Sequence, residues 1–169
     1  MIAGAVVCLR APRDADEVLL SDMRHDVELQ RMLMARSRPA GIAGVREWLD
    51  RRRSDSSSLL FVITDAESDE AVGFVQVTGM DTVSGHARLG IAVAEARRRR
   101  GFGRDALDLV ARYLREVFAL RKVVLEVQAE NTAAISLYHS AGYTDVGIHA
   151  EHFYFDGVFH DVAVMERRL

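Results

Sequence analysis

The feature that most restricts how this chain can fold is a change of hydrophobic period between residues 89 and 120. Leu89–Ala94 is an apolar run of strand length, and a turn with four consecutive arginines follows it. From Gly101 to Leu120 the apolar side chains recur at intervals of three and four residues, as in an amphipathic helix. A strand that passes through a glycine-containing turn into a helix is typical of folds that mix helices with a sheet.

Further apolar patterns on either side of this unit predict the remaining strands and helices. Strand-length runs occupy Val6–Leu9, Leu59–Thr64, Ala71–Thr78, Val123–Gln128, Tyr143–Ile148 and Val158–Met165. Helical spacing predicts two short helices between Ala15 and Ala35, one over Val45–Arg53, and one opened by Asn131 and closed by Gly142. We expect a loop over Ser37–Gly44 and a hairpin tip at Asp156-Gly157.

These elements favour one domain with a mixed sheet. The chain has 169 residues, of which 49% are hydrophobic, and it contains no internal repeat, low-complexity tract or linker. The strands at 59–64, 71–78 and 89–94 resemble an antiparallel meander. We therefore expect an α/β (α+β) fold as a single domain over residues 1–169, with a mixed, mostly antiparallel central sheet flanked by helices.

Charge and cysteine content argue against several kinds of partner. Lys plus Arg total 22 against 25 for Asp plus Glu, so the net charge of -3 disfavours a nucleic acid or an acidic membrane. The apolar stretches are far shorter than the roughly 18 residues of a membrane helix. With Cys8 as its one cysteine, the chain can build no internal disulfide or multi-cysteine zinc site, and it suits a reducing cytoplasm. The histidines lack metal-ligand spacing, so we expect no metal.

The arginine-rich turn has the chemistry of an anion site. It reads Arg98-x-x-Gly101-x-Gly103 where the predicted strand enters the predicted helix. The first N–H groups of a helix lack intrahelical partners, and glycines let a phosphate approach them. With the charge of the flanking arginines, the turn has the outline of a diphosphate site. Its spacing differs from that of two known phosphate loops, because it lacks the Gly-Lys-Ser/Thr ending of a triphosphate loop and the three glycines of a dinucleotide fold. The alternatives are a plain turn with solvated arginines and a nucleic-acid patch, which the net charge disfavours.

Two motifs follow one another in the second half of the chain. The first is Arg98-x-x-Gly101-x-Gly103-x-x-Ala106-Leu107, and the second, after Leu125-Glu126-Val127, is Asn131-x-x-Ala134-x-x-Leu137-Tyr138-x-x-x-Gly142-Tyr143. Together they resemble the GNAT superfamily of acyl-CoA-dependent N-acetyltransferases, well over Ala71–Leu169 and more loosely over Val7–Val45. The start at Leu9-Arg10 and the ending Asp156-Gly157-x-x-x-Asp161-x-x-x-Met165 look like the branch with ribosomal-protein N-terminal and spermidine acetyltransferases.

This resemblance implies a sheet splayed between the predicted fourth and fifth strands, 89–94 and 123–128, with acetyl-CoA in the V-shaped opening. The strand residues Ile91, Ala92 and Val93 would pair with the pantetheine arm. Asn131, a helix N-cap by position, would contact the cofactor near the pantetheine. The pyrophosphate would lie on the turn made by Arg98, Arg99, Arg100, Gly101, Phe102, Gly103 and Arg104.

The resemblance also implies catalytic roles. Tyr138 matches the family's general acid, and a phenol with a pKa near ~10 keeps the proton that a departing thiolate needs. The alternative is a half-buried aromatic that only packs. An ammonium acceptor must also lose a proton before it attacks, and Glu126, beside the cleft, is our candidate base. The alternatives for this role stay open: His86, Asp26, Glu28 and His25.

The function implied is an acetyl-CoA-dependent N-acetyltransferase. A primary amine, which could be a protein N-terminus, a polyamine or another small amine, would attack the thioester directly with no covalent acyl-enzyme. The alternative is a non-catalytic acyl-CoA-binding or sensing domain. An aromatic cluster at the last hairpin could wall the acceptor pocket, contact a second copy in a homodimer, or only pack: Phe153, Tyr154, Phe155 and Phe159.

Overall fold

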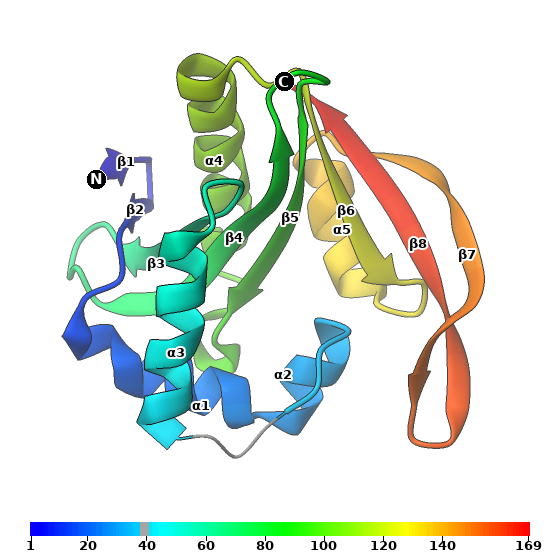
Figure 1. The fold of residues 1–169 in the computed structure, drawn as a ribbon, viewed down its shortest axis with the longest axis horizontal. Helices are drawn as coiled ribbons and strands as arrows, with labels where there is room; N and C mark the ends of the chain where they lie inside the picture. The colour runs from blue at the N-terminus through cyan, green and yellow to red at the C-terminus, as the bar shows by residue number, and fades with distance from the viewer. Residues whose placement is uncertain (38–40) are drawn as a thin grey trace.

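The strands of this protein, in a computed structural model that describes residues 1–37 and 41–169, form one mixed sheet (Figure 1). They are β1 (Ile2–Ala3), β2 (Val7–Arg10), β3 (Leu59–Asp65), β4 (Ala71–Asp81), β5 (His86–Val93), β6 (Lys122–Gln128), β7 (Thr144–Phe155) and β8 (Val158–Arg168). Their order across the sheet is β1-β2-β3-β4-β5-β6-β8-β7. All neighbours are antiparallel except β5 and β6, which confirms the expected mixed sheet and meander.

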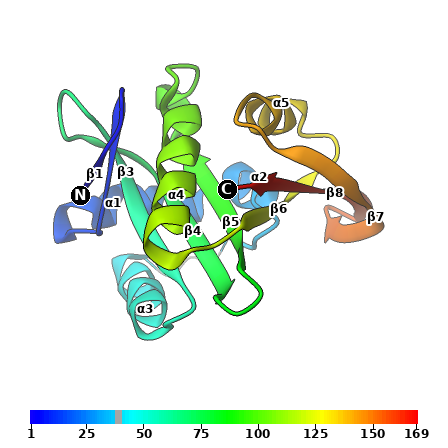
Figure 2. The same cartoon turned by 90° about the horizontal axis from the view of Figure 1, so that it is seen from above.

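Helices cover both faces of this sheet (Figure 2). They are α1 (Glu17–His25), α2 (Val27–Met32), α3 (Gly41–Ser54), α4 (Phe102–Phe118) and α5 (Thr132–Ser140), with short 3-10 turns at Asp14–Asp16 and Glu95–Arg97. One cluster of buried apolar residues lies between the first three helices and the sheet, and Phe74 of β4 and Ala92 of β5 belong to it. The larger cluster lies on the opposite face, beneath α4 and α5, with Leu107 and Leu125 at its centre.

The sheet splits where β5 and β6 part. These strands are paired over only three positions, from His86↔Lys122 to Arg88↔Val124. Beyond them β6 stays with β8 up to Gln128↔Val162, while β5 stays with β4 up to Gly73↔Val93. Each strand therefore follows its other neighbour, and the two lie apart at the ends away from the C-terminus (Figure 1). This confirms the splay predicted between segments 89–94 and 123–128.

The loop predicted over Ser37–Gly44 is wrong in its second half. Residues 38–40 lie outside the described residues, and α3 already begins at Gly41. The buried face of Val45, Trp48 and Leu49 fixes this helix against the sheet. This packing against the sheet stabilises one more helical turn before Val45. The turn forms although its two glycines, Gly41 and Gly44, each cost about 1 kcal/mol relative to alanine.

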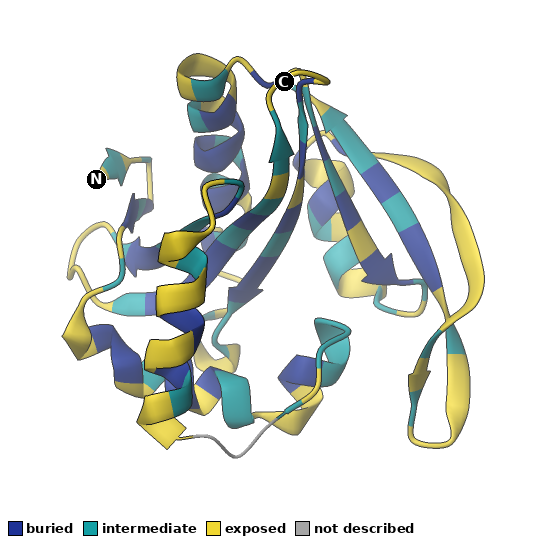
Figure 3. Ribbon diagram, viewed as in Figure 1, coloured by how far each residue is buried: buried dark blue, intermediate teal, exposed yellow. Residues whose placement is uncertain are grey.

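Burial explains why the elements lie in these layers (Figure 3). The inner strands β3 to β6 are largely buried, whereas β7 is exposed along nearly its whole length. Its hairpin with β8 turns at Asp156 and Gly157, whose φ angles of 50° and 81° are those of a tight two-residue turn, as predicted. Among the helices of the described chain, none has the length and apolarity that crossing a membrane requires.

Candidate active site

The gap between β5 and β6 exposes backbone groups of β5. The N–H of Ala94 donates to the carbonyl of Val72 at 2.9 Å, which makes Gly73↔Val93 a pair without direct hydrogen bonds. Because the pattern alternates, the N–H and C=O groups of Val93 and Ile91 point away from β4, into the gap. Those of Ala92 are used by β4. Of the three strand residues predicted to meet the cofactor, Ile91 therefore offers a free N–H and a free C=O. Val93 offers a free N–H, because its C=O accepts from Arg98 Nε. Ala92 offers only its side-chain face.

The predicted anion site lies at the end of this row. Gly101 is the N-cap of α4 with a φ of 82°, and no side chain caps the helix, so the N–H groups of residues 102–104 have no intrahelical partner. The one acid of the first turn, Asp105, faces away and accepts hydrogen bonds from Val6 N and Val7 N at 2.8 and 3.0 Å. Arg98 lies over the strand end, where its Nε donates to Val93 O at 3.1 Å. The positive end of α4 is thus open to an anion.

One cavity of about 730 Å³ joins the turn to the gap and to α5. The structure brings nearly all predicted site residues to its wall: Ile91, Ala92, Val93, Arg98, Arg99, Gly101, Phe102, Gly103, Arg104, Glu126, Asn131 and Tyr138. Arg100 is not among the lining residues. Gly103 lies close to helix α5, since a Cβ at this position would be 3.1 Å from Leu137 Cδ2. A side chain at this position would narrow the cavity.

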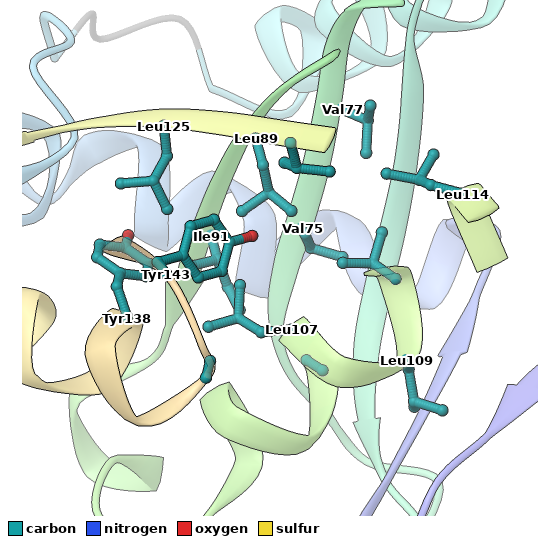
Figure 4. Packing of buried hydrophobic residues seen from close by; sticks show 14 of the residues in the cluster. Val75, Val77, Leu89, Ile91, Leu107, Leu109, Leu114, Leu125, Tyr138 and Tyr143 are labelled. Atoms are coloured by element: carbon teal, nitrogen blue, oxygen red, sulfur yellow. The ribbon is translucent and has the colours of Figure 1, made fainter. Parts of the chain in front are cut away.

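Helix α5 supplies the two predicted side chains on the β6 side. Asn131 caps it as predicted, because its Oδ1 accepts from Ala134 N at 3.1 Å. Two turns further along, the Tyr138 ring lies against the Tyr143 ring, with centroids 5.7 Å apart, and close to Leu125 (Figure 4). Burial raises the pKa of Tyr138 to about 12. The phenol therefore keeps its proton throughout the physiological range and can act only as a donor there.

Glu126 is the one candidate base that lines the cavity. His86 is 4.0 Å from Asp81 Oδ2, and Glu28 pairs with Arg31. Asp26 and His25 are hydrogen-bonded to the starts of helices. Asp26 Oδ1 accepts from Leu29 N at 2.9 Å, and His25 Nε2 accepts from Gly41 N at 3.2 Å. The alternation of β6 places Glu126 on the face opposite the buried Leu125. No hydrogen bond or ion pair is made to its carboxylate by any residue that the structure describes.

Helix α2 closes the cavity opposite the turn, which the sequence analysis did not anticipate in detail. Leu29, Met32, Leu33 and Met34 line it. Two hydrogen bonds tie the helix to β6: Arg31 Nη1 donates to Gln128 Oε1 at 3.1 Å, and Gln128 Nε2 donates to Arg31 O at 2.7 Å. The Arg31 guanidinium also lies over the Phe155 ring at 5.7 Å. The hairpin aromatics contact one another, and none of them lines the cavity.

Sequence reasoning missed several polar lining residues, among them Gln76, Thr78 and Arg88. Their signal was present in the strand alternation, because Gln76 and Arg88 each lie between two buried apolar neighbours, and Thr78 is two positions from Gln76, so all three face the other side of the sheet. Within the described ranges there is also no group of three or more His, Cys, Asp or Glu side chains that could hold a metal ion.

The comparisons with known proteins agree with this geometry. Spermidine N(1)-acetyltransferase of Vibrio cholerae is 26% identical over 121 residues, which are 72% of this chain and 69% of that protein. An N-alpha-acetyltransferase of Sulfurisphaera tokodaii is 36% identical over 87 residues, covering 50% of this chain and 51% of the relative. The crystal structure of the Vibrio cholerae spermidine N-acetyltransferase with CoA and spermine has the same fold, with a TM-score of 0.87 at 23% identity, over 96% of this chain and 95% of the other.

The family itself is fixed by a match that spans most of the chain. The family model of the acetyltransferase (GNAT) domain matches residues 7–144. That range includes the β5 strand, the arginine-glycine turn, the gap beside β6 and Tyr138. Since the sequence motifs, the split sheet and the family model agree, this chain belongs to the GNAT family of acetyltransferases.

Proposed function

We propose that this acetyltransferase moves the acetyl group of acetyl-CoA directly to a primary amine inside the cavity, with no acetyl-enzyme intermediate. The observation that carries the proposal is the continuous row of free donors and acceptors along one cavity wall. It begins with the open N–H groups of residues 102–104 and continues with the N–H of Val93 and with the N–H and C=O of Ile91. A diphosphate followed by an amide-containing arm matches that row in both charge and hydrogen bonding. Tyr138 lies across the gap.

Each remaining residue has a place in this reaction. The N–H of Val93 would polarise the thioester carbonyl and stabilise the oxyanion that forms when the amine attacks. Glu126, directly or through water, would take the proton that the ammonium must lose. When the carbon–sulfur bond breaks, the sulfur would receive the Tyr138 proton, which solvent then replaces. The products are an N-acetyl amine and CoA with a free thiol. The chain supplies donors and a base and needs no metal for any step.

The relatives suggest two kinds of acceptor for this family member. One similar protein is named a spermidine N(1)-acetyltransferase and another an N-alpha-acetyltransferase, and the structural neighbour was crystallised with CoA and spermine. These names suggest a polyamine or an α-amine as the acceptor here. Either acceptor presents a primary amine, as this proposal requires. A broad panel of such amines, assayed for release of the CoA thiol, tests the proposal against the alternative of a non-catalytic acyl-CoA sensor. Turnover with at least one amine is expected, whereas tight binding of acetyl-CoA with no turnover would favour the sensor.

Replacing Gly101 with alanine is expected to weaken acetyl-CoA binding about tenfold, measured by titration calorimetry. Gly101 has a φ of 82°, and an L-residue there costs about 1–2 kcal/mol, which the turn relieves by rotating its amides away from the diphosphate. Gly79→Ala is the matched control, because Gly79 also has a positive φ, of 57°, and open space around it, outside the cavity. Equal loss of affinity in both variants would show that strain alone, not the anion site, is responsible.

We also propose that the chain forms a homodimer through the β7–β8 hairpin. Large apolar side chains are exposed along it: Val146, Ile148, Tyr154, Val158 and Phe159. Sedimentation velocity is expected to give twice the mass of the chain, and charged substitutions at Ile148 and Phe159 are expected to return it to one. A monomer at all concentrations would contradict the dimer.

A further inference from the structure

Two side chains of opposite charge face the cavity where β5 and β6 part. Arg88 stands opposite Thr78 on β4 and opposite Val124 on β6. Glu126 follows Val124 by two positions, so it projects from the same face of the sheet as Arg88. Both residues line the cavity. Where the two strands part, β5 therefore presents a guanidinium to the cavity and β6 presents a carboxylate to the same cavity.

Neither charge is neutralised within the protein. The described residues make no hydrogen bond or ion pair with Arg88 or Glu126, although several other arginines have carboxylate partners, among them Arg10, Arg31, Arg46, Arg97 and Arg167. Solvent satisfies both groups while the cavity is open. A substrate that fills the space displaces this solvent, and an unpaired charge in such a place is costly. A ligand that brings the opposite charges avoids this cost.

The surroundings of the pair are uncharged but polar. Gln76 lies over Gly90, where an added Cβ would be 3.2 Å from Gln76 Nε2, and neither Gln76 nor Thr78 has a side-chain partner among the described residues. The facing wall from α2 is apolar at Leu29 and Met32. Glu126 is the sole acid among the described lining residues. A polyamine would therefore bring several cations to one carboxylate and would also meet the positive charge of Arg88.

We propose that the acceptor carries an anionic group, a carboxylate or a phosphate, close to its reactive amine. Arg88 binds the anion, and Glu126 accepts a hydrogen bond from the ammonium before the proton is removed. Gln76 and Thr78 supply further hydrogen bonds to the anion. This assignment rests on the proposed function, and it names the chemical class of acceptor within it.

Matched pairs of amines test this assignment. They are α-amino acids and β-alanine against their carboxamides, phosphoethanolamine against ethanolamine, and spermidine as the polycation. We expect kcat/KM to be about tenfold or more higher for the anionic member of at least one pair, the gain of one charged hydrogen-bonded pair. The amino-acid and phosphoethanolamine arms identify which anion is preferred. A wild-type preference for spermidine or for the neutral members would overturn the proposal.

Variants of Arg88 assign the preference to this residue. Arg88→Gln is expected to remove the advantage of the anionic member, and Arg88→Glu to reverse it in favour of the carboxamide and spermidine. Arg115→Gln is the control, since Arg115 is an exposed arginine of α4 away from the cavity. An anion preference that survives in Arg88→Gln would overturn the assignment.

A binding experiment separates this inference from the proposed function. Calorimetry with CoA-saturated protein measures the affinity for the N-acetylated form of each amine, which requires no turnover. Binding of the anionic products that is lost in Arg88→Gln, together with no turnover of any amine, would refute the acetyl transfer and keep the anion site. Turnover without any effect of Arg88 on binding or rate would refute the anion site and keep the acetyl transfer.

Discussion

Replacing Tyr138 with phenylalanine is expected to lower kcat by about 10²- to 10⁴-fold, the usual contribution of a positioned general acid. The change removes one oxygen from a ring that is otherwise packed in the core, so the ring keeps its contacts with Tyr143 and the cavity keeps its shape. Acetyl-CoA affinity should therefore stay close to that of the native protein. Steady-state thiol release, with calorimetry for binding, measures both quantities.

Tyr143→Phe is the matched control for this experiment. Tyr143 is an adjacent, equally buried tyrosine, but its hydroxyl has no hydrogen-bond partner among the described residues, and it does not line the cavity. Removing a buried hydroxyl without a partner costs little or stabilises the fold. Native kcat in Tyr143→Phe together with native kcat in Tyr138→Phe would remove Tyr138 from the mechanism.

The pH dependence carries a further expectation for Tyr138. Because burial raises the pKa of Tyr138 to about 12, the phenol stays protonated at every pH at which the protein can be assayed. The rate should therefore rise with pH as the acceptor amine and its base lose protons, with no fall that Tyr138 causes below about pH 11. A falling limb near pH 9 that disappears in Tyr138→Phe would contradict the raised pKa.

Asp16→Asn is expected to lower the free energy of unfolding by about 3 kcal/mol, the low end for breaking a buried ion pair, because Arg10 keeps only its 3.4 Å contact with the half-exposed Asp69. Arg10 Nη1 and Nη2 donate to the two Asp16 oxygens at 2.6 and 2.9 Å, and their side chains are only 7% and 3% exposed. The pair fastens the start of α1 to the end of β2. Urea denaturation measures the loss.

An exposed ion pair provides the comparison. Asp50 and Arg53 of α3 are 72% and 61% exposed, and Asp50→Asn should change the unfolding free energy by about 0–1 kcal/mol. Similar losses in Asp16→Asn and Asp50→Asn would contradict the special role of burial.

The same pair predicts how stability depends on pH. Burial tends to raise the pKa of Asp16, but hydrogen bonds from Arg10 and from the backbone of Arg13, with their positive charges, bring it below its ordinary value. A carboxylate with a lowered pKa in the folded state contributes its full stability above its ordinary pKa of about 3.9 and loses it as the pH falls through the lower, folded value. Native protein should lose this contribution in acid, and Asp16→Asn should not.

The strand-to-helix unit shows why much of the site could be predicted from sequence. Strand β5, the turn and helix α4 follow one another directly along the chain. The spacing of the apolar side chains within β5 and within α4 is enough to predict a strand and a helix. The spacing of Gly101 and Gly103 fixes which backbone groups the turn exposes. Which backbone groups of β5 face the gap could not be read from the sequence. Only the register with β4 shows that those of Ile91 and Val93, and not those of Ala92, point away from β4.

Arg88 and helix α2 show what the sequence could not specify. Arg88 reaches the cavity because β5 pairs with both β4 and β6, and those contacts join residues far apart along the chain. Similarly, α2 closes the cavity through Arg31 and Gln128, which are 97 residues apart. The start of α3 at Gly41 depends on burial against the sheet, which no local rule contains. Tertiary packing decides all three features.

A single-turnover experiment with acetyl-CoA labelled in the acetyl group tests the central claim most directly. The protein, in excess over the labelled acetyl-CoA, is mixed with it and with an amine that supports turnover, then quenched, and mass spectrometry follows the label. Direct transfer predicts that the label passes to the amine nitrogen, with one free CoA thiol for each N-acetyl product and no labelled protein at any time. Label found on the protein before it reaches the amine would contradict the account.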